Sequence, residues 1–509
     1  MRTRAPLDLE PDARWRNFGG NLHDRPVRFL APARQAAATT PEAYADAVLG
    51  HAAALGLRVR AYGARWSFSP AAYEADVLVD LRRFDRIGAP LLAREVEAGV
   101  DATRLLVTEP GATLAALAAE AEARGRSLPT TNGRGGPTIA GAIATGSHGS
   151  AVERPPLGDA VRALGLAVGP GHALWLEAAS APTLRANAVE AMGYTLVRDD
   201  ALLAAAQVHL GCFGLVTRVV LELDDAFDLL HRWDDVAVDA RCLGFVRTLD
   251  RGALGLGTDA PLYHANLVMN PHRPARGRLS TATRAPALTP ASRPPPTSAS
   301  PVVPASPLFG LALGQLVERA PALAPAVMDR LLEGATQPAT RRGRLGTIFP
   351  AKIPRGYRTL SWELAVDRAD GPAVLEHVVG EIARRPDGYL YPGFVAVRWV
   401  RGTRAPMGFT AFPETMTLEL PTLGGVRGTE AFLAHLHGSL ERAGVRFLEH
   451  PGQHNHLTPA RLAVGYGARL EAWRAARAQL LGGSAATFES AWTQDIGLTA
   501  APAVPTRAG

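Results

Sequence analysis

The first half of the chain alternates short apolar runs with longer segments whose apolar residues recur at helical spacing. Three apolar runs have the length of strands: residues 27–32, 77–81 and 105–108. Thr40 followed by Pro41 is typical of a helix start, and Gly56 supplies a matching helix end. Residues 114–124 repeat leucine and alanine at helical spacing. Between about residues 25 and 223 the pattern predicts an α/β arrangement.

The pattern changes after about residue 224. Two stretches alternate like strands and two have helical spacing, namely residues 360–366 and 415–420, and residues 373–383 and 429–443. We therefore expect a second domain, built from a mixed sheet with covering helices. Residues 270–307 are dense in Pro, Ala, Ser, Thr and Arg with almost no periodic apolar signal. This composition predicts a disordered insertion.

Length and composition support a globular protein of two domains. The chain has 509 residues, of which 47% are hydrophobic, and this length exceeds what one ordinary core accommodates. The formal net charge is +6, but the arginines are scattered among acidic residues, so we expect no nucleic-acid partner. The N-terminus lacks a signal-peptide core and no apolar run is long enough to span a membrane. We expect a cytoplasmic protein without membrane contact.

The cysteines indicate neither a disulfide scaffold nor a metal site. Cys212 and Cys242 are the only two, and we expect both to be buried apolar residues. No Cys/His spacing is typical of zinc binding, so the sequence predicts no metal.

Three stretches rich in glycine and small residues carry the functional signal. They are GARWSFS at residues 63–69, PTIAGAIATGSHGS at residues 137–150 and HLGCFGLVTRV at residues 209–219. Small residues let a backbone run against a flat or phosphorylated ligand. In this order and spacing, the three stretches resemble the flavin-binding domain of the vanillyl-alcohol-oxidase superfamily, and within it the aldonolactone and alditol oxidases.

The resemblance implies a fold and a division of the chain. The fold is α+β, with a PCMH-type FAD-binding domain of two α/β subdomains and a mixed-sheet substrate (cap) domain. The implied FAD-binding domain covers residues 12–225, and the cap domain covers residues 226–458 with the insertion at 270–307. Residues 459–509 would return to the FAD-binding domain.

The resemblance also implies FAD, held mainly through backbone amides, because converging N–H groups bind anions without a basic side chain. Residues 63–69 would form the first cradle, residues 138–150 would follow the flavin ring and phosphates, and Val216 would lie near the adenine. The implied cofactor-binding residues are Gly63, Ala64, Arg65, Trp66, Ser67, Phe68, Thr138, Gly141, Ile143, Gly146, Ser147, Ser150, Val216 and His450.

Trp66 departs from the family pattern. Many relatives have a histidine at this position that bonds covalently to the flavin, and indole lacks the nucleophilic imidazole nitrogen. We therefore predict non-covalent FAD. Trp66 would either stack on the dimethylbenzene edge of the flavin or simply pack. His148 matches a structural histidine of the family, the alternative being a chemical role as attachment point or acid–base group.

The substrate side is altered further. The stretch LEHPGQHNHL at residues 448–457 resembles the family motif His-Trp-Gly-Lys, with His450 retained and Gln453 replacing the lysine. A glutamine forms hydrogen bonds but does not carry charge. Arg398 matches the arginine of a Glu-x-Arg strand motif, whereas Ala396 replaces its glutamate. An arginine there would hold an anionic group or developing alkoxide, the alternative being simple ion pairing.

The predicted catalytic residues are therefore Arg398, Gln453 and His454. If a base is needed, His454, His456 or Glu419 would supply it, and His454 is favoured because imidazole titrates near neutrality. The implied function is oxidation of a CH–OH or similar group of a small molecule by hydride transfer to flavin N5, with electrons passing to dioxygen or another acceptor. The alternatives are a dehydrogenase or reductase of the same fold, or an altered flavin-binding protein without turnover. The sequence does not indicate the oligomeric state.

Overall fold

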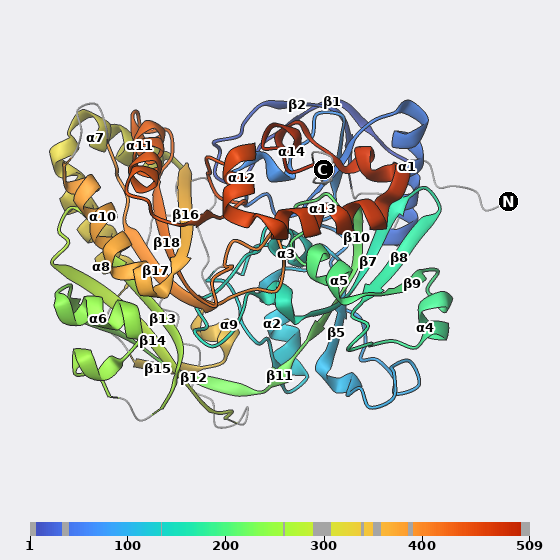
Figure 1. The fold of residues 1–509 in the computed structure, drawn as a ribbon, viewed down its shortest axis with the longest axis horizontal. Coiled ribbons are helices and arrows are strands. Elements are labelled where there is room, and N and C mark those ends of the chain that lie inside the picture. Colours follow the sequence, from blue (N-terminus) through green and yellow to red (C-terminus); the bar gives the residue numbers. More distant parts are fainter. Residues whose placement is uncertain are drawn as a thin grey trace, which may run out of the picture.

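The computed structural model describes residues 7–32, 40–133, 135–257, 260–288, 307–336, 340–349, 358–384 and 390–499. Its strands form four sheets. Three of them, with four, five and two strands, belong to the first half of the chain, and an eight-stranded sheet belongs to the second half. In Figure 1 the eight-stranded sheet lies at the left and the four- and five-stranded sheets at the right.

The first sheet has four strands in the order β1-β2-β4-β3. These are β1 (Glu10–Trp15), β2 (Arg25–Ala31), β4 (Val77–Asp80) and β3 (Val59–Tyr62). Helix α1 (Pro41–Leu55) connects β2 to β3. The Thr40 hydroxyl accepts a hydrogen bond from Ala43 N, and Gly56 has φ 62°, so both predicted helix ends are confirmed.

The second sheet has five strands in the order β5-β10-β7-β8-β9. These are β5 (Leu105–Thr108), β10 (Leu215–Glu222), β7 (Val161–Gly169), β8 (His172–Glu177) and β9 (Thr195–Arg198). Its associated helices are α2 (Leu114–Ala123), α3 (Ile139–Ala144), α4 (Ala186–Ala191) and α5 (Asp200–Ala206). Two α/β layers are thus present in the first half, and the predicted fold class is confirmed.

The third large unit is the eight-stranded sheet, ordered β15-β12-β14-β13-β17-β18-β16-β19. Its strands are β15 (Thr340–Gly343), β12 (Phe227–Ala237), β14 (Arg276–Pro286), β13 (Leu262–Met269), β17 (Val395–Arg401), β18 (Glu414–Leu423), β16 (Thr359–Asp367) and β19 (Leu448–Glu449). Three amphipathic helices cover its outer face with buried apolar side chains, namely α6 (Ala240–Thr248), α10 (Gly371–Arg384) and α11 (Thr429–Arg442). Its other face packs in part against the core of the first half.

The prediction of disorder across residues 270–307 is wrong for residues 276–286. These form β14, which is hydrogen-bonded on both sides, to β12 and to β13. Leu279 and Ala282 are buried within it. The strand consists largely of Ser, Thr, Ala and Arg, so its pattern is weak, and the two neighbouring strands supply the order that composition does not show. Residues 289–306 lie outside the described residues.

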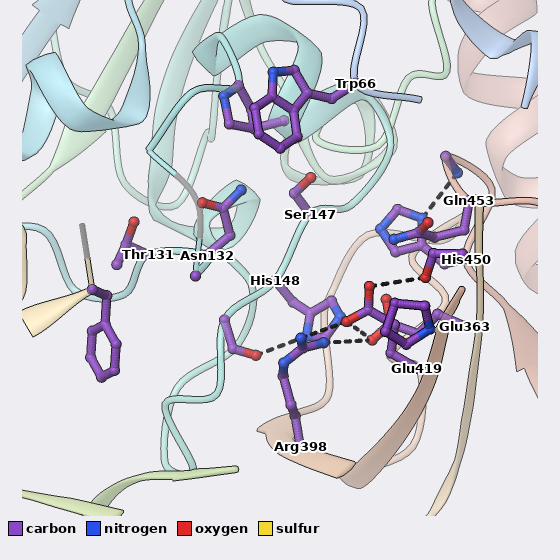
Figure 2. A pocket seen from close by; sticks show the side chains of 18 of the residues that line it. Trp66, Thr131, Asn132, Ser147, His148, Glu363, Arg398, Glu419, His450 and Gln453 are labelled. Atoms are coloured by element: carbon purple, nitrogen blue, oxygen red, sulfur yellow. Dashed lines mark hydrogen bonds and ion pairs between the residues drawn. The ribbon is translucent and has the colours of Figure 1, made fainter. Parts of the chain in front are cut away.

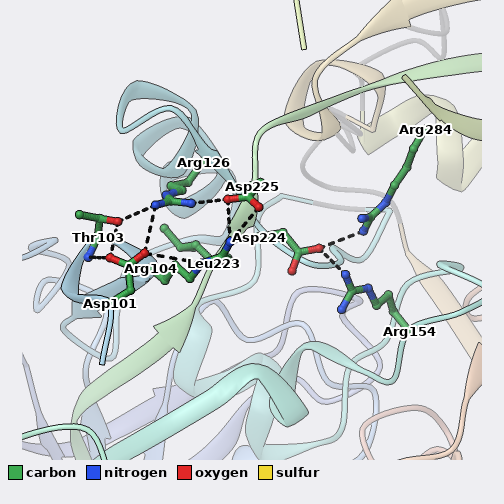
Figure 3. A network of polar contacts seen from close by, with 9 residues as sticks. All are labelled: Asp101, Thr103, Arg104, Arg126, Arg154, Leu223, Asp224, Asp225 and Arg284. Atoms are coloured by element: carbon green, nitrogen blue, oxygen red, sulfur yellow. Dashed lines mark hydrogen bonds and ion pairs between the residues drawn. The ribbon is translucent and has the colours of Figure 1, made fainter. Parts of the chain in front are cut away.

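A short polar connection joins the first half to the eight-stranded sheet. Strand β11 (Asp224–Asp225) pairs with β6 (Arg126–Ser127) just before β12 begins. The Asp224 carboxylate binds Arg154 at 2.5 Å and Arg284 at 3.0 Å, and Asp225 binds Arg104 at 2.7 Å. Figure 3 shows these ion pairs on both sides of the connection.

The C-terminal helices cross back to the first half of the chain. They are α12 (Pro459–Tyr466), α13 (Ala468–Leu481) and α14 (Ala491–Asp495), coloured red in Figure 1. Trp473 Nε1 donates to Val208 O at 3.0 Å, and Arg477 Nε donates to Cys212 O at 3.2 Å. Both cysteines are buried, as expected. None of the helices that the structure describes has the length and apolar character needed to cross a membrane.

Candidate active site between the flavin loops and the eight-stranded sheet

A cavity of about 1990 Å³ separates the loops of the first half from the inner face of the eight-stranded sheet. Sites for drug-sized ligands usually measure about 300–1000 Å³, so this cavity has room for a dinucleotide together with a substrate. Figure 2 shows Trp66 and Ser147 on one side of the opening, with Arg398 and Glu419 on the opposite side.

Most of the predicted residues line this cavity. The residues that do so are Gly63, Ala64, Arg65, Trp66, Ser67, Phe68, Thr138, Gly141, Ser147, Ser150, Val216, Arg398, His450 and Gln453. The structure thus brings together three separate loops and two strands of the eight-stranded sheet around one space.

Three predicted residues do not line the cavity. Ile143 points into the apolar core of the first half, because it lies on the inner side of α3. Gly146 makes the turn after α3 with φ 69°, and its α-carbon faces Val208. His454 N donates to Ser361 O, and its ring packs edge-on against His456 instead of facing the cavity. The hypothesis that His454 is the base has no support from its position.

The first two loops form a close backbone cradle. A Cβ atom on Gly63 would lie 1.9 Å from Thr138 Oγ1, and one on Gly149 would lie 2.1 Å from Thr131 O. Both positions therefore require glycine. Thr138 Oγ1 is buried and has no hydrogen-bond partner, although Thr138 lines the cavity.

The third loop supplies a second orphaned polar atom. His209 Nδ1 accepts a hydrogen bond from Gly211 N at 3.0 Å, so its proton is on Nε2, which is buried without a partner. Burial, and secondarily Arg60, lowers the pKa of His209 to about 3. The ring is therefore a neutral donor on the cavity wall near Val216. Orphaned donors together with exposed loop backbone fit the phosphates and ribose of FAD.

Trp66 is held by packing. Its indole stacks on the Phe18 ring with a centroid distance of 4.3 Å and an interplanar angle of 4°. A Cβ atom on Gly136 would lie 2.7 Å from Trp66 Cζ2. Tight contacts therefore hold the indole in place at the cavity wall, which favours the packing interpretation.

A cluster of three charged side chains faces the cavity from the sheet side and contacts His148 of the second loop. Arg398 Nη2 lies 2.5 Å from Glu419 Oε2, and Arg398 Nη1 lies 3.3 Å from Glu363 Oε1. Glu363 Oε1 is also 3.0 Å from His148 Nε2. Burial alone would lower the pKa of Arg398, but Glu419 and Glu363 raise it above its usual value. Arg398 is therefore a fixed cation, flanked by two carboxylates.

The hydrogen bonds of His148 determine where its protons lie. Nδ1 faces Gly149 O at 2.8 Å, and a carbonyl oxygen only accepts, so Nδ1 carries a hydrogen. Nε2 lies 3.0 Å from Glu363 Oε1. Burial would raise the pKa of Glu363, but His148 and then Arg398 lower it well below its usual range, so Glu363 is ionised. Its contact with His148 anchors the second loop to β16.

His450 and Gln453 lie in the loop that follows β19, which pairs with β16. His450 N donates to Glu363 O at 2.9 Å, and Phe68 N donates to Gly452 O at 2.8 Å, so this loop also contacts the first cradle. Burial lowers the pKa of His450 to about 4. Its Nδ1 accepts from Gly452 N at 2.9 Å, which leaves a hydrogen on Nε2. Gln453 Oε1 is buried without a partner.

The sequence analysis missed Glu363 as a site residue. The signal was present, because Ser361 and Glu363 are polar positions in an otherwise apolar stretch and share one face of β16. Ser361 donates to Glu419 Oε1 at 3.0 Å.

A second polar patch on the same sheet was also missed by the sequence analysis. In it, Ser280 Oγ bridges His231 Nε2 at 2.8 Å and His264 Nε2 at 3.1 Å.

Alongside this polar patch, one part of the sheet face is apolar. Ala396, which stands at the family's glutamate position, packs with Val268 and Leu332. All three line the cavity. The wall next to Arg398 is therefore apolar at residue 396, where the family motif has its glutamate.

Known proteins and protein families resemble this chain in both sequence and fold. Residues 32–177 match the family model described as FAD binding domain. Residues 32–177 are therefore an FAD-binding domain. The expected resemblance to the vanillyl-alcohol-oxidase superfamily, and to its FAD cofactor, is thereby confirmed.

Relatives within the superfamily match only part of the chain. L-gulono-1,4-lactone dehydrogenase of Mycobacterium tuberculosis is 29% identical over 220 residues, which is 43% of this chain and 42% of that protein. Putative D-arabinono-1,4-lactone oxidase of Neurospora crassa is 29% identical over 127 residues, which is 25% of this chain and 20% of that protein. The matches thus span less than half the length of these relatives.

Solved structures of the superfamily share the whole fold. Cholesterol oxidase from B. sterolicum superposes with a TM-score of 0.69 at 15% identity, covering 96% of this chain and 97% of that chain. Xylooligosaccharide oxidase from Myceliophthora thermophila, in complex with xylobiose, gives a TM-score of 0.60 at 13% identity, covering 96% and 94%. At these identities the likeness establishes the fold.

Proposed function

We propose that this protein is an FAD-dependent oxidoreductase that converts a CH–OH group of a small molecule to a carbonyl. The observation that carries the proposal is the position of Arg398. It is a fixed cation between Glu363 and Glu419, on the sheet face across the cavity from the flavin-binding loops. Bound FAD would supply the hydride acceptor, at N5 of its ring.

Arg398 would bind the substrate oxygen. As the hydroxyl loses its proton, negative charge develops on that oxygen, and a guanidinium held in place by two carboxylates stabilises it without reorganisation. His450 is neutral and carries hydrogen on Nε2, so it is a hydrogen-bond donor at the same wall. The orphaned Oε1 of Gln453 would accept a hydrogen bond from a second hydroxyl or amine of the ligand.

Glu419 is the base that we propose. Of the three candidates considered from sequence, Glu419 lines the cavity, whereas His454 and His456 do not. Its carboxylate accepts from Ser361 Oγ at 3.0 Å and from Arg398, so the Ser361 hydroxyl could relay a proton to it. The hydroxyl proton would pass to Glu419 while the carbon loses hydride, which leaves a neutral carbonyl.

The substrate would carry its hydroxyl on a mainly apolar skeleton. Ala396, Val268 and Leu332 line the wall beside Arg398, where a polyol would need hydrogen-bonding partners for each neighbouring hydroxyl. The His231–Ser280–His264 patch would receive a neutral polar group further along the molecule. The aldonolactones in the names of the two relatives are therefore less suited to this wall.

The test is anaerobic reduction of the purified yellow protein by a panel of alcohols. Hydroxylated apolar compounds should bleach the flavin, whereas alditols and aldonolactones should be slower by about tenfold or more, as expected for unpaired hydroxyls against an apolar wall. Ala396→Glu combined with Gln453→Lys should reverse this preference, with Arg401→Ala, a change on the same strand as Ala396 but outside the cavity, as control. A flavin that no alcohol reduces would contradict the proposed activity.

Admission of air to the reduced protein then identifies the electron acceptor. Rapid recovery of the yellow colour with hydrogen peroxide formation would indicate an oxidase. Persistence of the reduced flavin until an artificial acceptor is added would indicate a dehydrogenase. The two names among the relatives include one of each type.

A further inference from the structure

A second cluster of titratable side chains lies behind the wall that carries Glu363. It consists of His437 on α11, Glu449 on β19 and His456 in the loop that follows. One ligand atom from each lies within 4.8 Å of the others. We propose that these three residues bind a divalent transition-metal ion of the zinc class.

The separations of the ligand atoms suit such an ion. His437 Nε2 lies 3.4 Å from Glu449 Oε2 and His456 Nδ1 lies 3.2 Å from Glu449 Oε1, so each imidazole faces its own carboxylate oxygen, and one ligand atom from each residue lies within 4.8 Å of the others. Zinc binds histidine nitrogen and carboxylate oxygen at about 2.0–2.2 Å, and in a tetrahedral site this places neighbouring ligand atoms about 3.3–3.5 Å apart. Two imidazoles with one carboxylate form a donor set typical of zinc and neighbouring metals.

An unpartnered buried atom points to a missing ligand. The His437 side chain is 2% exposed, and its Nε2 has no hydrogen-bond partner although Glu449 is near. Leaving such an atom unsatisfied in the interior is unfavourable. A metal ion bound to Nε2 would satisfy it.

Surrounding contacts orient the ligands. Glu449 Oε1 accepts hydrogen bonds from Trp362 Nε1 at 2.6 Å and from His456 N at 3.0 Å. His437 Nδ1 lies 3.6 Å from Glu441 Oε2, the arrangement in which a carboxylate holds the far nitrogen of a metal-bound imidazole.

The three ligands come from a helix, a strand and a loop, so no short spacing in the sequence indicates them, and the sequence analysis predicted no metal. Glu449 and His456 stand on either side of the loop that carries His450 and Gln453 to the cavity. An ion bound to both residues and to His437 would fix both ends of this loop to α11. The site would thus be structural and would support the geometry of the cavity wall.

The first measurement is the metal content of untagged holoprotein prepared from zinc-supplemented culture and desalted. We expect about one equivalent of zinc per chain. Chelator-treated protein should regain thermal stability when Zn²⁺ is added, because an ion that binds only the folded state raises Tm. Added Co²⁺ should give the visible bands of a tetrahedral ion beyond the flavin absorption.

Variants then locate the ion. His437→Ala and His456→Ala should each lose the bound equivalent, and Glu441→Gln should weaken zinc binding by about 10- to 100-fold. His435→Ala is the matched control, because His435 is on the same helix but contacts Glu381 at 2.9 Å. FAD content in the same samples reports whether each variant folds.

Two results would overturn the proposal. One is wild-type protein that holds no more zinc than His437→Ala and gives no Co²⁺ bands, which would leave the three residues as a hydrogen-bonded cluster only. The other is full zinc retention in both histidine variants. If those variants do not fold, the Co²⁺ titration of the wild-type protein decides by itself.

Discussion

Arg398 is the residue on which the proposed chemistry depends. Its guanidinium contacts the buried carboxylates of Glu363 and Glu419, and its side chain lines the cavity. A guanidinium between two glutamates is often a structural ion pair, and the sequence analysis kept that interpretation open. In the proposed mechanism the two roles coexist, because the carboxylates would hold the cation in the orientation that the substrate oxygen requires.

We expect Arg398→Ala to lower the rate of flavin reduction by about 10²–10³-fold while FAD content stays near the wild-type value. The reason is the loss of about 2.7–4 kcal/mol of stabilisation of the developing alkoxide. Arg398→Lys should restore part of the rate, since it returns the charge between Glu363 and Glu419. Gln453→Ala should cost less, about fivefold, because a neutral hydrogen bond contributes about 1 kcal/mol.

Rapid-mixing measurement of flavin bleaching checks these values. Arg401→Ala is the matched control, because Arg401 lies on the same strand but is half exposed and pairs with Glu153. Equal rates for Arg398→Ala and the control would place the chemistry elsewhere in the cavity.

Trp66 leads to a second prediction at this scale. Because it lies at the first cradle and has no nucleophilic nitrogen, we expect FAD to be bound by non-covalent contacts alone. Acid precipitation should therefore release the yellow colour into the supernatant. Colour in the pellet would indicate a bond to another residue, and mass spectrometry of a flavin-labelled peptide would identify it.

At the scale of elements, β14 shows how neighbouring strands determine structure. Its sequence is polar and small, yet it lies between β12 and β13, and Leu279 is fully buried in the core beneath α6. Leu279→Ala should lower the free energy of unfolding by about 2–5 kcal/mol. Arg276→Ala at the exposed start of the strand should cost much less.

Thermal unfolding of both variants with saturating FAD tests this prediction. A Leu279→Ala variant as stable as the wild type would mean that β14 is dispensable, as the sequence composition suggested.

The elements that the sequence predicted well share one property. Strands β2, β4, β5, β16 and β18 and helices α1, α2, α10 and α11 each carry a clear apolar period or a capping residue of their own. Strand β14 was missed because its order comes from its neighbours. The family motif led to Arg398 and Gln453, whereas Glu363 was missed because a glutamate in an apolar strand has no motif. His454 was misplaced because a loop sequence does not determine which side chain faces a cavity.

The whole molecule buries several histidines in the neutral form. Burial is the main cause that lowers the pKa of His209 to about 3 and the pKa values of His231, His450 and His454 to about 4. Each value lies below the ordinary 6.5, so the unfolded chain binds more protons between pH 6.5 and about 4. The stability that these groups contribute is present above pH 6.5 and is lost as the pH falls.

We therefore expect Tm to fall steeply between pH 6.5 and 5, with each of these histidines contributing up to about 1.4 kcal/mol per pH unit. Calorimetry across this range, with FAD in excess, measures the slope. His231→Gln should make it shallower, whereas His23→Gln, at an exposed position, should leave it unchanged. A Tm independent of pH in this window would contradict the neutral burial of these rings.

The return of the C-terminal helices also affects how the protein is made. Helix α13 fills the core of the first half with Trp473, and the buried Arg60 on β3 donates to Phe488 O at 3.4 Å. A ribosome synthesises the glycine-rich loops long before it reaches these residues. During translation the nascent nucleotide-binding half therefore exposes the apolar surface that α13 will cover. Emergence of α13, rather than emergence of those loops from the exit tunnel, sets the moment at which the cofactor can be held firmly.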